Sequence, residues 1–118
     1  MSRILVVDDD NSLRILYTKE LRDEGYDVES ASSGVEALAA IAARRPDVVV
    51  LDIKMEGMDG LSVLDEIMKR DKTIPVILNT AYSTFKSDFT TWSAEAYVVK
   101  SSDLTELKDT LKQILQAV

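Results

Sequence analysis

The chain has 118 residues, 46% hydrophobic and 30% charged, and this size predicts one domain, residues 1–118, around a single core. It has no cysteine and no histidine, which excludes disulfides, thiolate nucleophiles and Cys-based zinc sites and removes the commonest general base. A net charge of −7 opposes nucleic-acid phosphates and anionic lipids, so we expect no direct nucleic-acid binding and no membrane association. The absence of cysteine and of any long apolar run favours a cytoplasmic location.

The N-terminal part of the chain predicts a strand, a helix and a second strand. Residues 4–7 are apolar and β-branched, as in a central strand that helices cover on both faces. Asp10 or Asn11 is positioned to cap the following helix, and Gly25 is expected to end it. The residues expected to face inward from this helix are Leu13, Leu16, Tyr17 and Leu21. Residues 26–31 alternate in polarity, which indicates a half-exposed edge strand.

The middle of the chain predicts two further helices around a third strand. Ser33 and Glu36 have the spacing of a capping box for an Ala-rich helix. Its inward residues are expected to be Val35, Leu38 and Ile41. Pro46 ends this helix before the apolar strand that leads to Asp52, and Gly57 and Gly60 bracket the next turn. The inward residues of the third helix are expected to be Leu61, Leu64, Ile67 and Met68.

The C-terminal part predicts two more strands and two more helices. Pro75 begins an apolar strand that ends at Thr80, and a shorter one ends at Lys100. Between them, residues 81–96 predict a short helix with Phe85, Phe89 and Trp92 at helical spacing. Asp103 and Glu106 have the spacing of a second capping box and are expected to start a last amphipathic helix.

Strands that alternate with helices five times predict an α/β fold, a doubly wound parallel sheet with right-handed crossovers and helices on both faces. In such sheets the ligand crevice lies beyond the carboxyl ends of the strands. The polar residues expected to meet there are Asp8, Asp9, Asp52, Thr80 and Lys100.

Three of these residues are carboxylates, and crowded carboxylates repel one another unless a hard cation or shared protons relieve them. Asp8 or Asp9 alone would be as readily explained by helix capping or by a solvated charge. Together with Asp52 they favour a divalent metal site. Asp10 is interpreted as a cap or a solvated charge.

Over nearly its whole length the chain resembles a response-regulator receiver domain, the phosphoacceptor module of two-component signalling. The resemblance is carried by the acidic strand end at residues 4–10, by Leu51-Asp52 with residues 57–60, by Thr80-Ala81 and by residues 97–100. It implies a flavodoxin-like sheet of five strands in the order 2-1-3-4-5 with five helices.

The resemblance also implies roles for particular residues. Asp52 would be the phosphoacceptor. The implied ligands of Mg²⁺, or Mn²⁺, are Asp9, Asp52, Asp8 through water and the backbone carbonyl of Lys54. Thr80 and Lys100 would contact the phosphoryl group, and Tyr97 would move inward with Thr80 as a switch. Lys54 and Tyr82 would shield the acyl phosphate from water.

One departure from the family pattern concerns the backbone after Lys100. The family usually has proline there, in a cis peptide bond, whereas this chain has Ser101. A cis bond before a residue other than proline costs about 3–4 kcal/mol, so we expect a trans bond.

The function that follows is a stand-alone receiver, not an enzyme with an external substrate, that takes a phosphoryl group from a histidine kinase or phosphotransfer protein. Its downstream protein target would bind the face formed by residues 81–96, the last strand and the last helix. Two alternatives are a degenerate receiver that acts as a docking module and an aspartyl-phosphate phosphohydrolase. The phosphohydrolase is less favoured because Asp8 and Asp9 are adjacent and no cap insertion is present.

Overall fold

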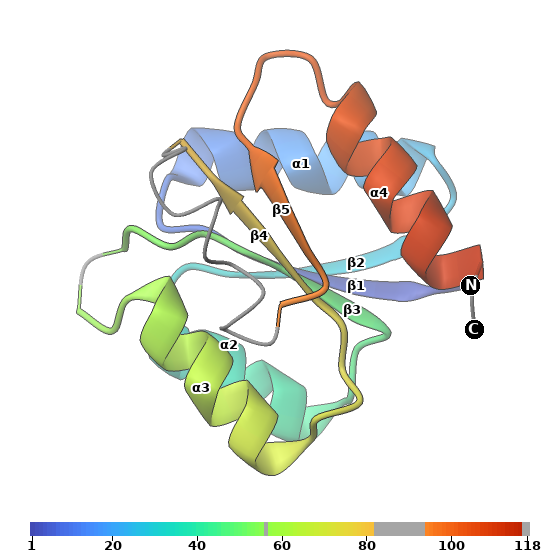
Figure 1. Ribbon diagram of the computed structural model, residues 1–118. Coiled ribbons are helices and arrows are strands. Elements are labelled where there is room, and N and C mark those ends of the chain that lie inside the picture. The colour runs from blue at the N-terminus through green and yellow to red at the C-terminus, as the bar shows by residue number, and fades with distance from the viewer. Residues whose placement is uncertain (56, 82–93, 117–118) are drawn as a thin grey trace.

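The computed structural model describes residues 1–55, 57–81 and 94–116. They form three layers, with one sheet between two layers of helices (Figure 1). The strands are β1 Arg3–Val7, β2 Asp27–Ala31, β3 Val48–Leu51, β4 Val76–Thr80 and β5 Ala96–Val99. The helices of the described residues are α1 Asn11–Asp23, α2 Gly34–Ala43, α3 Gly60–Arg70 and α4 Thr105–Gln116. All strand pairs are parallel, in the order β2-β1-β3-β4-β5, which confirms the predicted flavodoxin-like sheet. The helix predicted in residues 81–96, with Phe85, Phe89 and Trp92, falls mostly outside the described residues.

Apolar side chains fill both faces of the sheet. Helices α1 and α4 cover one face and α2 and α3 the other (Figure 1). On β1, Ile4 and Val6 pack on the α1 and α4 side, whereas Leu5 and Val7 pack on the α2 and α3 side. This two-sided burial explains why the central strands are continuously apolar. No helix among the described residues is long and apolar enough to cross a bilayer.

The edge strand β2 differs from the central strands. Only Val28 and Ala31 of its five residues are buried, so β2 is the half-exposed edge strand that was predicted, although its buried residues pack on opposite faces rather than alternating. Its carboxylates interact with Arg3 of β1, whose guanidinium lies 3.0 Å from Glu29 and 3.6 Å from Asp27. The charged residues of β2 therefore lie at the rim of the sheet.

Helix ends follow the predicted capping signals. The Asp10 carboxylate accepts a hydrogen bond from the Leu13 amide at 3.1 Å, and Gly25 follows α1 with a φ of 95°. Ser33 caps α2, but the Glu36 carboxylate contacts Ser32 rather than Ser33. At the start of α4, the Asp103 carboxylate accepts a hydrogen bond from the amide of Thr105, the first residue of the helix. Asp59 caps the start of α3.

Two residues predicted to face the core are exposed. Val35 is 73% exposed and Leu16 is 41% exposed. The buried stripes run along Leu38 and Ile41 in α2 and along Tyr17 and Leu21 in α1. Val35 is next to the buried Gly34 and Leu16 is next to the buried Tyr17, and one residue corresponds to about 100° around the helix. Apolar spacing therefore identified most inward residues, but it placed these two on the wrong side of the stripe.

Candidate functional site

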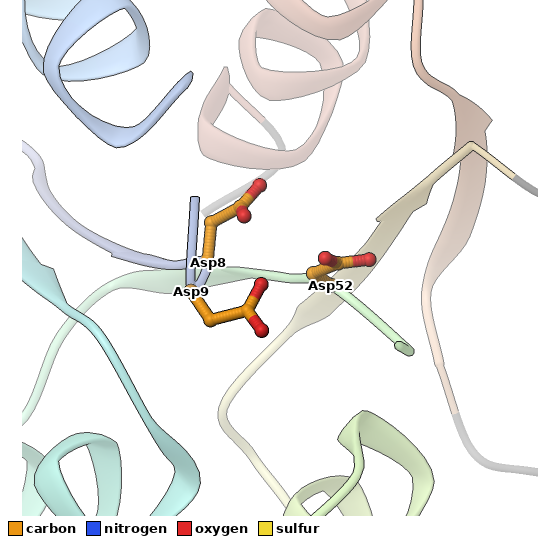
Figure 2. Close-up of side chains that lie close together, drawn as sticks. All are labelled: Asp8, Asp9 and Asp52. Atoms are coloured by element: carbon orange, nitrogen blue, oxygen red, sulfur yellow. The ribbon is translucent and has the colours of Figure 1, made fainter. Parts of the chain in front are cut away.

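Two adjacent strands bring three carboxylates together. Because Val7 is paired with Leu51, the residues that follow them, Asp8 and Asp52, lie side by side, and the Asp52 amide donates to the Val7 carbonyl at 3.0 Å. Carboxylate oxygens of Asp8, Asp9 and Asp52 all lie within 4.8 Å of one another (Figure 2). Asp8 and Asp52 are buried, whereas Asp9 is exposed to solvent. The structure thus brings together the carboxylates that the sequence predicted.

Lys100 supplies a positive charge to this cluster. Its ammonium lies 2.7 Å from Asp8 Oδ2 and 3.2 Å from Asp52 Oδ2. Its backbone amide donates to the Thr80 carbonyl at 2.7 Å, which fixes the end of β5 beside β4. The described residues contain no cis peptide bond, so the Lys100–Ser101 bond is trans, as predicted. The resemblance assigned Lys100 to a phosphoryl group, and in the structure its ammonium pairs with two carboxylates and partly compensates their charge.

The electrostatics of the cluster follow from burial and charge. Burial raises the pKa of Asp52, and the nearby Asp8 charge raises it further, against the lowering effects of Lys100 and of a hydrogen bond from the Lys54 backbone. Burial alone would lower the pKa of Lys100, but its hydrogen bonds and ion pairs with Asp8 and Asp52 leave that pKa raised. Lys100 is therefore a fixed cation at neutral pH.

Backbone and side-chain donors hold Asp8 in place. Asp8 Oδ1 accepts a hydrogen bond from the Asp10 amide at 2.9 Å, and the Asp8 carbonyl accepts from Arg14 Nη1 at 2.9 Å. With Lys100 on the other carboxylate oxygen, both oxygens of Asp8 are engaged. Asp9 lies on the open side of the cluster, and its carboxylate points toward the region of Asp52 (Figure 2).

The other residues predicted for the site are not part of the carboxylate cluster. Thr80 is fully buried at the end of β4, and Lys54 is an exposed residue two positions after Asp52. Tyr97 is paired with Leu78 and packs with the core on the α2 and α3 side, where it is 7% exposed. Tyr82 lies outside the described residues.

Gly60, the first residue of α3, has a role that residue spacing did not reveal. Its amide donates to the Ile53 carbonyl at 2.7 Å, so the start of α3 contacts the loop that follows Asp52. A Cβ atom at this position would lie 2.0 Å from the Asp52 carbonyl oxygen and 2.7 Å from Ile53 Cα. Gly60 is therefore required for the close approach of two backbone segments.

We expect Gly60→Ala to lower the free energy of unfolding by about 2 kcal/mol or more, because the added methyl group meets backbone rather than a flexible side chain. The matched control is Gly57→Ala, where no atom lies within 4 Å of the added Cβ but a φ of 77° strains alanine; its loss should be smaller, about 1 kcal/mol. Urea denaturation measures both variants. Equal losses would show that the close approach at Gly60 has no special importance.

The sequence matches the family described as response regulator receiver domain over residues 4–112. The chain belongs to this family. Among curated relatives, the sporulation initiation phosphotransferase F of Bacillus subtilis is 36% identical over 115 residues, which cover 96% of this chain and 93% of that protein.

Solved receiver structures have the same fold. The response regulator TrrA of Thermotoga maritima, in complex with Mg²⁺ and BeF, is 46% identical and has a TM-score of 0.91, with 97% of this chain and 99% of that one covered. TrrA in complex with the histidine kinase ThkA gives 47% identity, a TM-score of 0.90 and coverage of 98% and 99%. These comparisons confirm both the family and the fold expected from the sequence.

The carboxylates of this receiver domain fit a hard divalent ion. Mg²⁺ prefers oxygen ligands and usually binds through one or two carboxylates while it keeps several waters. Two buried carboxylates with a third on the solvent side offer such a donor set. No nitrogen or sulfur ligand is available from histidine or cysteine anywhere in the sequence, which favours Mg²⁺ over softer metals.

Proposed function

We propose that this receiver domain accepts a phosphoryl group on Asp52 from the phosphohistidine of a histidine kinase or phosphotransfer protein, in a reaction that depends on Mg²⁺. The observation that carries the proposal is the meeting of Asp8, Asp9 and Asp52 with Lys100 at the carboxyl edge of the sheet. The TrrA structures, one with Mg²⁺ and BeF and one with a histidine kinase, support it.

Asp52 acts as the nucleophile in this proposal. One carboxylate oxygen forms a bond to phosphorus while the phosphorus–nitrogen bond to the donor imidazole breaks, and the bonding electrons stay on that nitrogen. The hydrogen bond from the Lys54 backbone and the ion pair with Lys100 restrict how the Asp52 carboxylate rotates. No histidine of the chain is needed, because an ionised carboxylate needs no general base.

Magnesium would be held by Asp9 and Asp52, by Asp8 through water and by the Lys54 carbonyl, and when bound it would neutralise charge between the carboxylates and the phosphoryl oxygens. Lys100 then contacts one phosphoryl oxygen, and the Thr80 hydroxyl donates to another. Tyr97 lies on β5, beside β4. As the switch residue, it moves inward when Thr80 moves toward the phosphoryl group.

The test is intact-mass measurement after exposure to acetyl phosphate, with and without Mg²⁺. We expect an adduct of about 80 Da that requires both the metal and Asp52 and is lost in Asp52→Asn. Asp59→Asn is the control, because Asp59 caps α3 and asparagine also caps helices. An adduct that survives Asp52→Asn would refute the assignment. No adduct in the wild type would instead favour a docking module that works without phosphorylation.

The lifetime of the acyl phosphate is expected to depend on Lys54 and Tyr82. We expect Lys54→Ala and Tyr82→Ala to shorten it by about two- to tenfold, because smaller side chains leave the phosphoryl group more open to water. The decay of the phosphorylated protein, followed by mass, measures this effect. Lys72→Ala is the control, because Lys72 lies in the turn between α3 and β4, at the edge of the sheet opposite the carboxyl ends of the strands. Unchanged lifetimes in the two variants would rule out shielding.

The output of the domain is proposed to be protein binding through residues 81–96, β5 and α4; residues 82–93 of this set lie outside the described residues. Support comes from the position of Tyr97 on β5 and of Lys100 at its end, which link this face to Asp52. That the receiver acts without an attached output domain, over residues 1–118, stays a prediction. The 93% coverage of the Bacillus subtilis phosphotransferase supports it.

A further inference from the structure

A buried polar pair lies beside the carboxylate cluster on the α1 and α4 side of the sheet. Tyr17 of α1 is 1% exposed and Asn79 of β4 is 3% exposed. The Tyr17 hydroxyl and the Asn79 side-chain amide share a hydrogen bond. Tyr17 otherwise packs among hydrophobic residues such as Ile77 and Leu107, and Asn79 is one of five buried polar or charged residues of the described chain, with Arg3, Asp8, Asp52 and Thr80. Buried polar groups reduce stability unless they are satisfied, which raises the question of what this pair does.

The position of Asn79 relates the pair to Lys100. In the sheet, β4 lies between β5, which Lys100 follows, and β3, which Asp52 follows. The Lys100 ammonium contacts Asp52, so the side chain has to cross the end of β4 to reach it. Asn79 is paired with Val98, and side chains two residues apart on a strand share a face, so Asn79 and Lys100 lie on the same face.

A cavity joins the same residues. It has a volume of about 740 Å³ and is lined by Tyr17, Asn79 and Lys100 together with residues of α4 such as Leu104 and Leu107. Lys100 is therefore not packed tightly from the α4 side, and the long lysine side chain has many rotamers. The hydrogen-bonded Tyr17 and Asn79 side chains supply polar lining to the cavity that Lys100 also lines.

We propose that the Tyr17–Asn79 pair is a positioning element that holds the Lys100 side chain across β4, so that its ammonium meets Asp52. Neither residue touches the phosphoryl group; both act through Lys100. The inference rests on the proposed phosphoacceptor function for its effect on rate, but the position of Lys100 is measurable without it.

The test is a double-mutant cycle with Tyr17→Phe, Asn79→Leu and the double variant. Each single variant leaves one buried polar group without its partner and should be less stable than the wild type. The double variant replaces both groups by apolar ones and should regain most of that stability. We nevertheless expect its phosphorylation by acetyl phosphate to stay about two- to tenfold slower than in the wild type, because Lys100 has lost its support.

A second measurement follows Lys100 directly. The ¹⁵N signal of its ammonium should be observable in the wild type because the ion pairs slow proton exchange with water, and it should broaden in the double variant. Thr110→Val, which changes another residue lining the cavity, is the control and should change neither rate nor signal. If the double variant recovers stability, rate and the Lys100 signal together, the pair serves packing only and the proposal is overturned. If the wild type takes no phosphoryl group, the proposed function fails, and the Lys100 signal alone decides the positioning role.

Discussion

Lys100→Met is expected to lower the free energy of unfolding by about 3 kcal/mol when measured in a chelator. The substitution keeps much of the side-chain volume but leaves Asp8 and Asp52 as buried carboxylates without their cation. Added Mg²⁺ should restore a large part of the loss, because a divalent ion bound to Asp52, with Asp8 reached through water, compensates the charge that Lys100 no longer balances. The wild type should gain less from Mg²⁺ than the variant, since Lys100 already provides part of this compensation.

Urea denaturation at neutral pH, with EDTA and then with Mg²⁺, measures this effect. Lys108→Met is the matched control. Lys108 pairs with Glu20 and Glu24, whose side chains are 35% exposed, whereas the carboxylates that pair with Lys100 are 3% and 7% exposed. Its loss should be small and independent of Mg²⁺. Equal losses for the two lysines, or no response of Lys100→Met to Mg²⁺, would contradict the role assigned to the buried cation.

Asp9→Asn is expected to weaken Mg²⁺ binding by at least about tenfold, because it removes the solvent-facing carboxylate of the cluster. Phosphorylation by acetyl phosphate should fall in parallel at low Mg²⁺ and recover partly at high Mg²⁺. Because Asp9 is exposed and adds a third negative charge to the cluster, the substitution should not lower stability in the absence of metal and should raise it slightly.

The neighbouring residue provides a control with the same change in charge. Asp10 is also exposed, caps α1 and is not part of the carboxylate cluster, and asparagine is an equally good cap. Isothermal titration calorimetry with Mg²⁺ should therefore show nearly wild-type affinity for Asp10→Asn. If both variants lose affinity equally, net charge near the site, rather than ligation by Asp9, determines binding.

The sequence predicted the sheet and the members of the carboxylate cluster because both depend on regular features. Parallel strands covered on both faces need apolar side chains at every position, so the strand that ends at Asp8 and the strand that ends at Asp52 were easily recognised. In a doubly wound parallel sheet the carboxyl ends of neighbouring strands lie at the same edge, so these two strand ends were expected to lie together. The trans bond after Lys100 followed equally from the energy of the peptide group.

Other features depended on contacts that spacing does not encode. Val35 and Leu16 were assigned to the core because apolar spacing fits more than one helix face. The partners of Lys100 could not be read from the sequence, since an ammonium at a strand end pairs with whichever carboxylates the sheet brings near. Asn79 was visible as a polar residue in an apolar run, but only the structure shows that Tyr17, 62 positions earlier, is its partner.

The rim strand β2 has a consequence for how copies of this protein behave when concentrated. Asp27 and Glu29 lie at the open side of the sheet, where Arg3 contacts both and Arg44 contacts Asp27. Pairing two such rims along a shared hydrogen-bonded ladder would take these charged side chains out of water, which disfavours pairing between molecules. The same acidic residues that make β2 a poor central strand therefore protect the domain against edge-to-edge aggregation.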